Sequence, residues 1–133
     1  MSSWKENLSK VMPELEGYIS KLMDSPRVLF GEANPPRKPG AYIIYDHDKN
    51  LSYIGEAKGS GGLRDRLLNK HLSGDDNHAI QRAYKVSHPE RPLRREYIKN
   101  NVSVRWVETP DANTALAVER LLILMFSPVW NRK

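Results

Sequence analysis

Two tyrosines in neighbouring apolar segments are the first residues whose spacing could support chemistry. Residues 40–45 and 51–55 are rich in aromatic and β-branched side chains, which predicts two strands, and residues 46–50 between them have turn chemistry. The two segments therefore form a predicted hairpin, with Tyr42 on its first strand and Tyr53 on its second.

The turn determines how the two strands pair. If the turn is centred on residues 48–49, Tyr53 lies opposite Ile44 and Gly55 lies opposite Tyr42. Because strand side chains alternate between faces, Tyr42 and Tyr53 then share one face as diagonal neighbours within about 7–8 Å. Their hydroxyls could converge on one substrate atom, although tyrosines in a hairpin are more often ordinary strand residues that fill a core.

An acid in the last predicted helix is the second candidate for chemistry. Residues 115–126 are apolar almost all round, so this helix should be largely buried, and Glu119 lies in its middle. A buried carboxylate is unfavourable by several kcal/mol, in order of magnitude, unless it is paired or bound to a metal. A salt bridge to Arg64 or Arg66 and ligation of a hard cation such as Mg²⁺ explain the position equally well.

A histidine continues the apolar face of another predicted helix. Leu63, Leu67 and His71 fall at i, i+4 and i+8, so His71 should be at least partly buried, while Arg66 and Lys70 share a neighbouring face. A lone histidine on a core-facing line is more often a hydrogen-bonded core residue than a catalyst.

The remaining segments predict a domain in which these residues are held together. A helix over residues 63–72 follows the hairpin, Asp76 or Asn77 could cap another helix, residues 88–101 are expected to be loop and short helix, and residues 102–107 alternate as a third strand. Asp111 or Asn113 can cap the last helix. We predict a single domain over residues 1–133 of mixed α/β (α+β) class, with a small three-stranded antiparallel sheet flanked by helices in the order α-β-β-α-α-β-α.

An N-terminal helical extension is expected over residues 1–26. Pro13 interrupts its amphipathic pattern, which predicts a kink or two short helices. The apolar residues that recur at three- and four-residue steps are Trp4, Leu8, Val11, Leu15, Tyr18 and Leu22.

Positive charge is confined to the middle of the chain. The net charge is +5, and between Lys58 and Arg105 there are eleven Lys and Arg against five Asp and Glu. This distribution is typical of a surface that meets phosphates, the alternative being a solvated face with no partner. The absence of cysteine excludes disulfides and cysteine zinc sites. With no long apolar run and a charged N-terminus in place of a signal peptide, no membrane association and a cytoplasmic (intracellular) location are expected.

These motifs, in this order and spacing, resemble the GIY-YIG nuclease family over residues 40–131. The matching elements are Gly40-Ala41-Tyr42, Tyr53-Ile54-Gly55, Arg66 within Leu63–Leu67, Glu119, and Pro128-Val129-Trp130-Asn131. Three features depart from the family pattern. Ala41 replaces the usual isoleucine, Gly59 to Gly62 lengthen a loop, and His71 lies five residues after Arg66, where some members have a histidine four after it.

The resemblance implies an endonuclease that hydrolyses DNA phosphodiester bonds by a one-metal mechanism. Glu119 would bind Mg²⁺, or Mn²⁺ in its place, and Arg66 would stabilise negative charge on the phosphate. Tyr42 would be the general base or would polarise the attacking water, and Tyr53 would position the water or the phosphate. Because a phenol with a pKa near 10 is a weak base at neutral pH, His71 or Lys70 would help Tyr42.

Other residues are expected in supporting or binding roles. Asn131 would orient Glu119. The residues predicted to contact nucleic acid are Lys58, Arg64, His78, Arg82, Arg94 and Arg95.

The target and the partners stay open at the level of sequence. Branched or duplex DNA is expected, RNA is retained as an alternative, and a homodimer could form through the N-terminal helix or on DNA. Three competing interpretations remain: a non-catalytic nucleic-acid-binding module of the same fold, a nuclease subunit that needs a partner for targeting, and an assembly protein whose basic strip is incidental.

Overall fold

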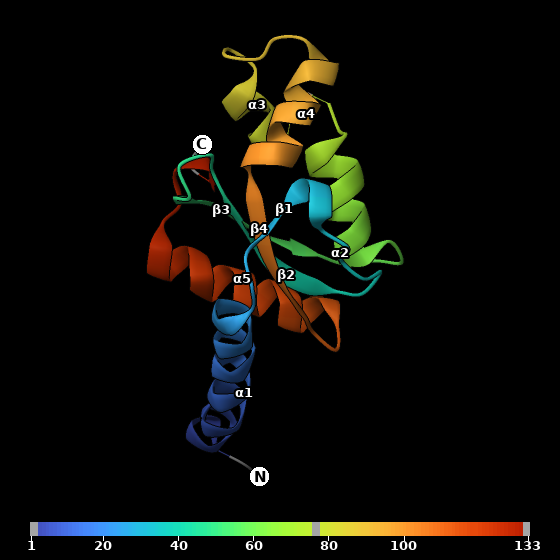
Figure 1. Ribbon diagram of the computed structural model, residues 1–133. Coiled ribbons are helices and arrows are strands. Elements are labelled where there is room, and N and C mark those ends of the chain that lie inside the picture. Colours follow the sequence, from blue (N-terminus) through green and yellow to red (C-terminus); the bar gives the residue numbers. More distant parts are fainter. Residues whose placement is uncertain (1–2, 76–77, 132–133) are drawn as a thin grey trace.

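A four-stranded sheet with helices on both faces forms the body of the protein. The computed structural model describes residues 3–75 and 78–131 (Figure 1). The elements, in order, are α1 (Trp4–Asp24), β1 (Val28–Leu29), the 3-10 turn η1 (Phe30–Glu32), β2 (Gly40–Tyr45), β3 (Leu51–Ala57), α2 (Gly62–Arg64), η2 (Asp65–Leu72), α3 (Ala79–Tyr84), α4 (Arg91–Asn101), β4 (Ser103–Glu108), α5 (Ala112–Phe126) and the 3-10 turn η3 (Val129–Asn131).

The sheet has one strand more than predicted. The strand order is β1-β4-β2-β3 and every pairing is antiparallel, so the α+β class and the antiparallel sheet flanked by helices are confirmed. The prediction of three strands is wrong, because β1 pairs with the outer edge of β4 through Val28 opposite Val104. With only two residues, β1 is too short to show the alternation by which a strand is recognised in sequence.

The hairpin pairs in the predicted register. Tyr42 lies opposite Gly55, and Ile44 lies opposite Tyr53. The rings of Tyr42 and Tyr53 have centroids 6.4 Å apart, which confirms that the two tyrosines are diagonal neighbours on one face.

The two faces of the sheet bury different clusters of side chains. On one face, η2, α3 and α4 cover the side chains of Tyr42, Ile44, Ala57 and Val104. On the other, α1 and α5 cover Ala41, Ile43, Ile54 and Val107. In Figure 1, α5 crosses beneath the sheet, and α3 and α4 lie at the opposite end of the molecule from α1.

The N-terminal helix runs without interruption through Pro13. Of the two alternatives expected at Pro13, a kink or two short helices, the second is wrong, since α1 is a single helix of 21 residues. Only Leu15 and Leu22 of α1 are buried, and its first half projects from the body (Figure 1) with Trp4 and Leu8 exposed. No helix in residues 3–75 or 78–131 has the length and apolar character needed to cross a membrane.

The structure differs from the prediction in one basic segment and agrees with one of the predicted helix caps. The basic stretch predicted as loop and short helix contains α4, an 11-residue helix with proline in its first turn. Asp111 caps α5, because its Oδ1 accepts a hydrogen bond of 2.7 Å from the backbone N–H of Thr114. The alternative caps Asp76 and Asn77, expected for the helix that is now α3, lie outside the described residues.

The last helix is less buried than its composition indicated. Only Ala115, Val118 and Leu122 of α5 are buried, and Leu124 is 79% exposed. The expectation of a largely buried helix is therefore wrong: α5 lies on the surface and presents one stripe to the sheet.

Candidate active site

A buried tyrosine and a buried histidine form the centre of the site. The hydroxyl of Tyr42 lies 2.6 Å from Nε2 of His71, and His71 is 1% exposed. Tyr42 reaches this position because a glycine faces it across the hairpin: a Cβ at residue 55 would collide with the Tyr42 hydroxyl. The position of the Tyr42 side chain therefore requires a glycine at residue 55.

Burial determines which of the two side chains carries the proton. Burial raises the pKa of Tyr42 far above its ordinary value, and the charges of Tyr53 and Glu119 add to this, although Arg66 opposes it. Burial also lowers the pKa of His71 to about 3, with the Arg66 and His78 cations contributing. At neutral pH a protonated Tyr42 therefore donates its hydrogen bond to a neutral His71.

The backbone between Arg66 and His71 explains their unusual spacing. The helix predicted over residues 63–72 consists of one turn of α-helix, α2, followed by a π-helix, η2, over Asp65–Leu72. In a π-helix each turn is wider, and residues five apart come to the same side. Arg66 and His71 both contact the hydroxyl of Tyr42, since Nε of Arg66 donates to it at 3.4 Å. The additional residue is absorbed by the backbone rather than by displacement of His71.

The guanidinium of Arg66 lies between the two tyrosine hydroxyls. Burial lowers the pKa of Arg66, but hydrogen bonds and charge interactions with Tyr42 and Tyr53 more than offset this and hold the pKa above its ordinary value. The ring of Tyr53 also lies at the edge of His71, with centroids 5.2 Å apart. Four of the predicted site residues, Tyr42, Tyr53, Arg66 and His71, therefore form one contiguous group.

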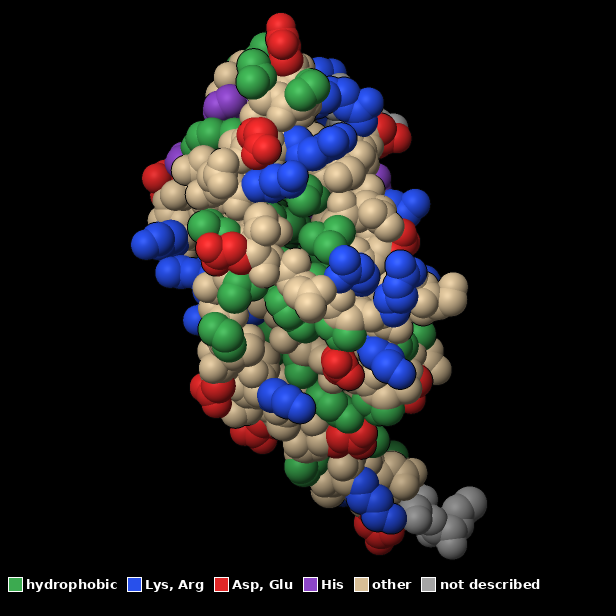
Figure 2. Space-filling view, turned by 45° about the vertical axis from the view of Figure 1, so that its right-hand side comes forward, with side chains coloured by type: hydrophobic (Ala, Val, Ile, Leu, Met, Phe, Trp, Pro, Cys, Tyr) green, Lys and Arg blue, Asp and Glu red, His purple; other side chains and the backbone are tan. Residues whose placement is uncertain are grey.

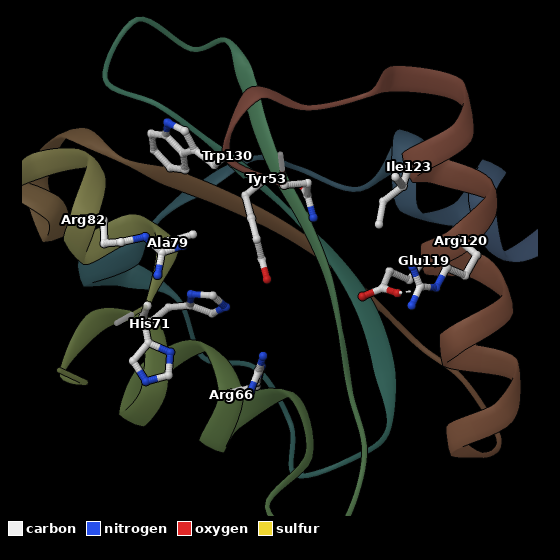
Figure 3. Close-up of a pocket in the computed structure, with 11 residues that line it drawn as sticks. Tyr53, Arg66, His71, Ala79, Arg82, Glu119, Arg120, Ile123 and Trp130 are labelled. Carbon is white, nitrogen blue, oxygen red and sulfur yellow. Dashed lines mark ion pairs between the residues drawn. The ribbon is translucent and has the colours of Figure 1, made fainter. Parts of the chain in front are cut away.

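The carboxylate of Glu119 reaches the same cavity from the other side of the sheet edge. A cavity of about 360 Å³ is lined by Tyr53, Arg66, His71 and Glu119, with His78, Ala79, Arg82, Arg120, Ile123, Trp130 and Asn131 at its margins. In Figure 3, Tyr53 and Arg66 extend into the space between the side chain of His71, held by η2, and that of Glu119, held by α5.

Glu119 is largely buried and only weakly paired. Its side chain is 14% exposed, and its ion pair is with Arg120, Nε to Oε1 at 3.5 Å, rather than with Arg64 or Arg66. Arg120 is itself 72% exposed, which weakens that pairing by solvent screening. Burial raises the pKa of Glu119, and the negative charge of Glu56 raises it further.

The oxygen donors around Glu119 suit a hard divalent cation. Glu119 supplies one carboxylate, and Oε2 of Glu56 is buried with no hydrogen-bond partner within residues 3–75 and 78–131. Those residues contain no group of three His, Asp or Glu side chains placed to hold a metal. Mg²⁺ commonly binds through one or two carboxylates and completes its octahedron with water and substrate phosphate, so this donor set fits Mg²⁺ or Mn²⁺.

The two predicted supporting residues lie elsewhere than expected. Lys70 is exposed and lines a neighbouring cavity, so His71 rather than Lys70 contacts the Tyr42 hydroxyl. Asn131 was expected to orient Glu119, but its side-chain amide makes two hydrogen bonds of 2.8 Å to the backbone of Ile54. It fastens the C-terminal segment to β3 beside Tyr53.

Some residues predicted to bind nucleic acid border the cavity. His78 and Arg82 line it directly, and Lys58 lines the neighbouring cavity that also contains Arg66. His78 lies beside His71, with ring centroids 5.9 Å apart, and burial lowers its pKa despite the opposing charge of Asp75.

The other three predicted contacts lie away from the cavity. Arg64 donates a hydrogen bond of 2.7 Å to Oδ1 of Asn34. This bond holds the proline-rich loop of residues 33–39 against α2. Arg95 is exposed on α4. Lys and Arg side chains gather in the upper part of the face seen in Figure 2. Arg94 is 0% exposed, so the prediction that it meets nucleic acid at the surface is wrong.

Sequence reasoning missed two charged residues of the site. Arg120 follows Glu119 directly, and adjacent positions on a helix do not normally face each other, so nothing in the spacing indicated their pairing. Glu56 lies on β3 directly after Tyr53-Ile54-Gly55, one residue beyond the end of the predicted strand over residues 51–55. An acid immediately after that motif was the signal that could have found it.

The fold and the site together define a small α+β domain with a cavity lined by tyrosine, histidine, arginine and glutamate at the edge of its sheet. Residues 38–133 match the family model described as the GIY-YIG catalytic domain. The chain therefore belongs to the GIY-YIG family. It is 31% identical over 98 residues to UvrABC system protein C of Aquifex aeolicus (strain VF5), a match that covers 74% of this chain and 14% of that protein.

Proposed function

We propose that this chain is an endonuclease that hydrolyses phosphodiester bonds in DNA. The observation that carries the proposal is the convergence of Tyr53, Arg66, His71 and Glu119 on one cavity. The buried hydroxyl of Tyr42 lies directly behind them, in contact with His71 and Arg66. Family membership supports the same activity. The name of the relative from Aquifex aeolicus assigns that protein to the UvrABC system, and the present chain matches only a small share of its length.

The residues of the chain divide the chemistry among them. Tyr42 accepts a proton from the attacking water while its own proton moves to Nε2 of His71, so that no free phenolate is required. Arg66 directs its fixed donors at the phosphate, where negative charge develops. Tyr53, at the cavity wall, positions the water or a phosphate oxygen. Glu119 would hold Mg²⁺ or Mn²⁺, and the chemistry that such a bound cation supplies is stabilisation of negative charge on the scissile phosphate.

The proposal is tested by digestion of supercoiled plasmid, branched DNA, single strands and RNA side by side, with Mg²⁺ and with chelator. Nicking of plasmid or branched DNA that disappears with chelator is the expected result. Binding of DNA without cleavage of any of the four substrates in Mg²⁺ or Mn²⁺ would favour the non-catalytic binding module instead.

Replacement of Arg66 by lysine should be almost as damaging to turnover as replacement by alanine. The geometry requires a planar fork, because Nε of Arg66 holds the Tyr42 hydroxyl while the remaining donors stay directed at the cavity. We expect both Arg66→Lys and Arg66→Ala to lower the single-turnover rate by on the order of 10²–10³-fold. Recovery of most of the activity in the lysine variant would reduce Arg66 to an electrostatic contact.

DNA affinity should fall steeply with salt, and Arg82 should account for part of the slope. Arg82 is exposed at the margin of the cavity, where a phosphate contact would release about one counterion. Arg82→Ala should weaken binding to all sequences alike and reduce the slope of log K against log salt by about one. Lys10→Ala removes an exposed charge from α1, far from the cavity, and should leave the slope unchanged. Equal slopes in the wild type and both variants would show that Arg82 does not contact the DNA phosphates.

A further inference from the structure

The buried oxygen of Glu56 is a polar atom that the activity proposed above does not use. Glu56 lies on β3, its side chain is half-buried, and Oε2 has no hydrogen-bond partner in the described part of the chain. A carboxylate oxygen removed from water without a partner is destabilising, and such atoms are rare in native proteins. A feature that compensates for the burial is therefore expected nearby.

The sheet places Glu56 on the side from which Glu119 approaches. Strand side chains alternate, so Glu56 shares the α5 face of β3 with Ile54, which packs in the cluster formed with α5. Because β3 is an edge strand, an acid on this face can reach around the open edge of the sheet. The helix α5, which carries Glu119, packs directly against β3, and the negative charge of Glu56 raises the pKa of Glu119.

The cavities beside the two acids share one lining residue, Arg66. Glu56 lines a cavity of about 340 Å³ together with Lys58, Asp65 and Lys70, and Arg66 lines both this cavity and the one that contains Glu119. Two carboxylates at one edge of a sheet repel each other, and a divalent cation held between them turns that repulsion into shared attraction.

We propose that Glu56 is a second carboxylate of the divalent-cation site to which Glu119 belongs. This inference rests on the proposed function, and it replaces a site with one protein carboxylate by a site with two. The principal competing role for Glu56 is an ion pair with Lys58 or Lys70, which line the same cavity.

Binding of Mn²⁺ to the full chain in the absence of nucleic acid tests the inference directly. Electron paramagnetic resonance or titration calorimetry would compare the wild type with E56Q, E119Q and D65N. We expect E56Q to weaken Mn²⁺ binding by about 10–100-fold, the range typical for loss of a carboxylate that supports a metal site. Asp65 is the matched control, since it lines the same cavity but its Oδ1 accepts a hydrogen bond of 3.0 Å from Asn69. The D65N variant should bind Mn²⁺ within about threefold of the wild type, the size of a screened long-range charge effect.

The melting temperature without metal supplies a second readout. If Glu56 is a cation ligand, E56Q removes repulsion of Glu119 and should melt at the same temperature as the wild type or higher. If Glu56 is an ion-pair partner of Lys58 or Lys70, E56Q should melt lower and keep its Mn²⁺ affinity, which would overturn the inference. Affinity in E56Q equal to that in D65N would overturn it as well.

The outcomes separate this inference from the proposed function. Loss of Mn²⁺ binding in E119Q together with unchanged binding in E56Q would refute the role of Glu56 and leave the endonuclease proposal intact. Failure of the wild type to bind Mn²⁺ would refute the two-carboxylate site, and it would refute the endonuclease as well only if plasmid nicking in Mg²⁺ or Mn²⁺ is also absent. Weakened binding in E56Q, with plasmid nicking restored at high Mn²⁺, is the expected pattern and supports both.

Discussion

Replacing Glu119 by glutamine should abolish metal-dependent nicking and leave DNA binding nearly intact. The substitution keeps the size of the side chain and removes only its charge, and Glu119 lies at the cavity wall rather than in a core cluster. Stabilisation of phosphate charge by a bound cation contributes several kcal/mol to a hydrolytic barrier, so we expect a loss on the order of 10³-fold or more. The measurement is single-turnover nicking of plasmid in saturating Mg²⁺, with affinity measured in parallel.

The control for Glu119→Gln is Glu96→Gln. Glu96 is exposed on α4 and lines neither cavity beside the site, so the same change in charge at that position should leave nicking and affinity unchanged. Cleavage at a normal rate in Glu119→Gln would show that the carboxylate is structural and that its ion pair with Arg120 is its whole role.

The register of the hairpin was predictable because two local rules agree on it. The turn over residues 46–50 fixes which residues pair, and a shift of the pairing by one residue would place Tyr42 and Tyr53 on opposite faces of the sheet. Gly55 adds a third constraint, since only a residue without a Cβ leaves room for the Tyr42 hydroxyl. Local sequence therefore determined the relative positions of Tyr42 and Tyr53 in the site.

Features that depend on contacts distant in sequence were not predictable. Arg94 occurs in a basic stretch, yet tertiary packing turns it inward while its neighbour Arg95 stays exposed. Asn131 finds its partner in the backbone of Ile54, 77 residues earlier, which no periodicity reveals. β1 contains only two residues, and it pairs with β4, a strand about 75 residues later in the chain, through Val28 opposite Val104.

The π-helix of η2 shows how a local irregularity can preserve a site. In a regular α-helix, a His71 placed five residues after Arg66 would turn one of the two side chains away from Tyr42. The structure instead widens the turn and keeps both on the hydroxyl. His71 and Leu72 are the last residues of η2, so their carbonyls have no partner within the helix. They accept hydrogen bonds of 2.7 and 3.0 Å from the buried side chain of Gln81, so α3 holds the end of η2 in place.

Removal of the Tyr42 hydroxyl should impair both cleavage and stability. In Tyr42→Phe the general base is lost, and turnover should fall by about 10²–10⁴-fold. Nε2 of the buried His71 also loses its partner, so the free energy of unfolding should drop by about 1–3 kcal/mol. Tyr53→Phe should cause a smaller loss of turnover and little change in stability, because Tyr53 is only half-buried at the cavity wall.

Tyr84→Phe separates the two effects of Tyr42→Phe, because Tyr84 belongs to a second tyrosine–histidine pair. Its hydroxyl lies 3.1 Å from Nδ1 of His47 and 3.0 Å from the backbone nitrogen of the same residue, and Tyr84 does not line the cavity. Burial raises the pKa of Tyr84 to about 12, so its hydroxyl, like that of Tyr42, stays protonated. Because His47 is exposed and water can replace its lost partner, loss of that hydroxyl should lower the melting temperature less than Tyr42→Phe does and leave the single-turnover rate normal. If Tyr42→Phe also cuts normally and differs from the wild type only in its melting temperature, both tyrosine–histidine pairs serve folding, and the water must be activated by another group.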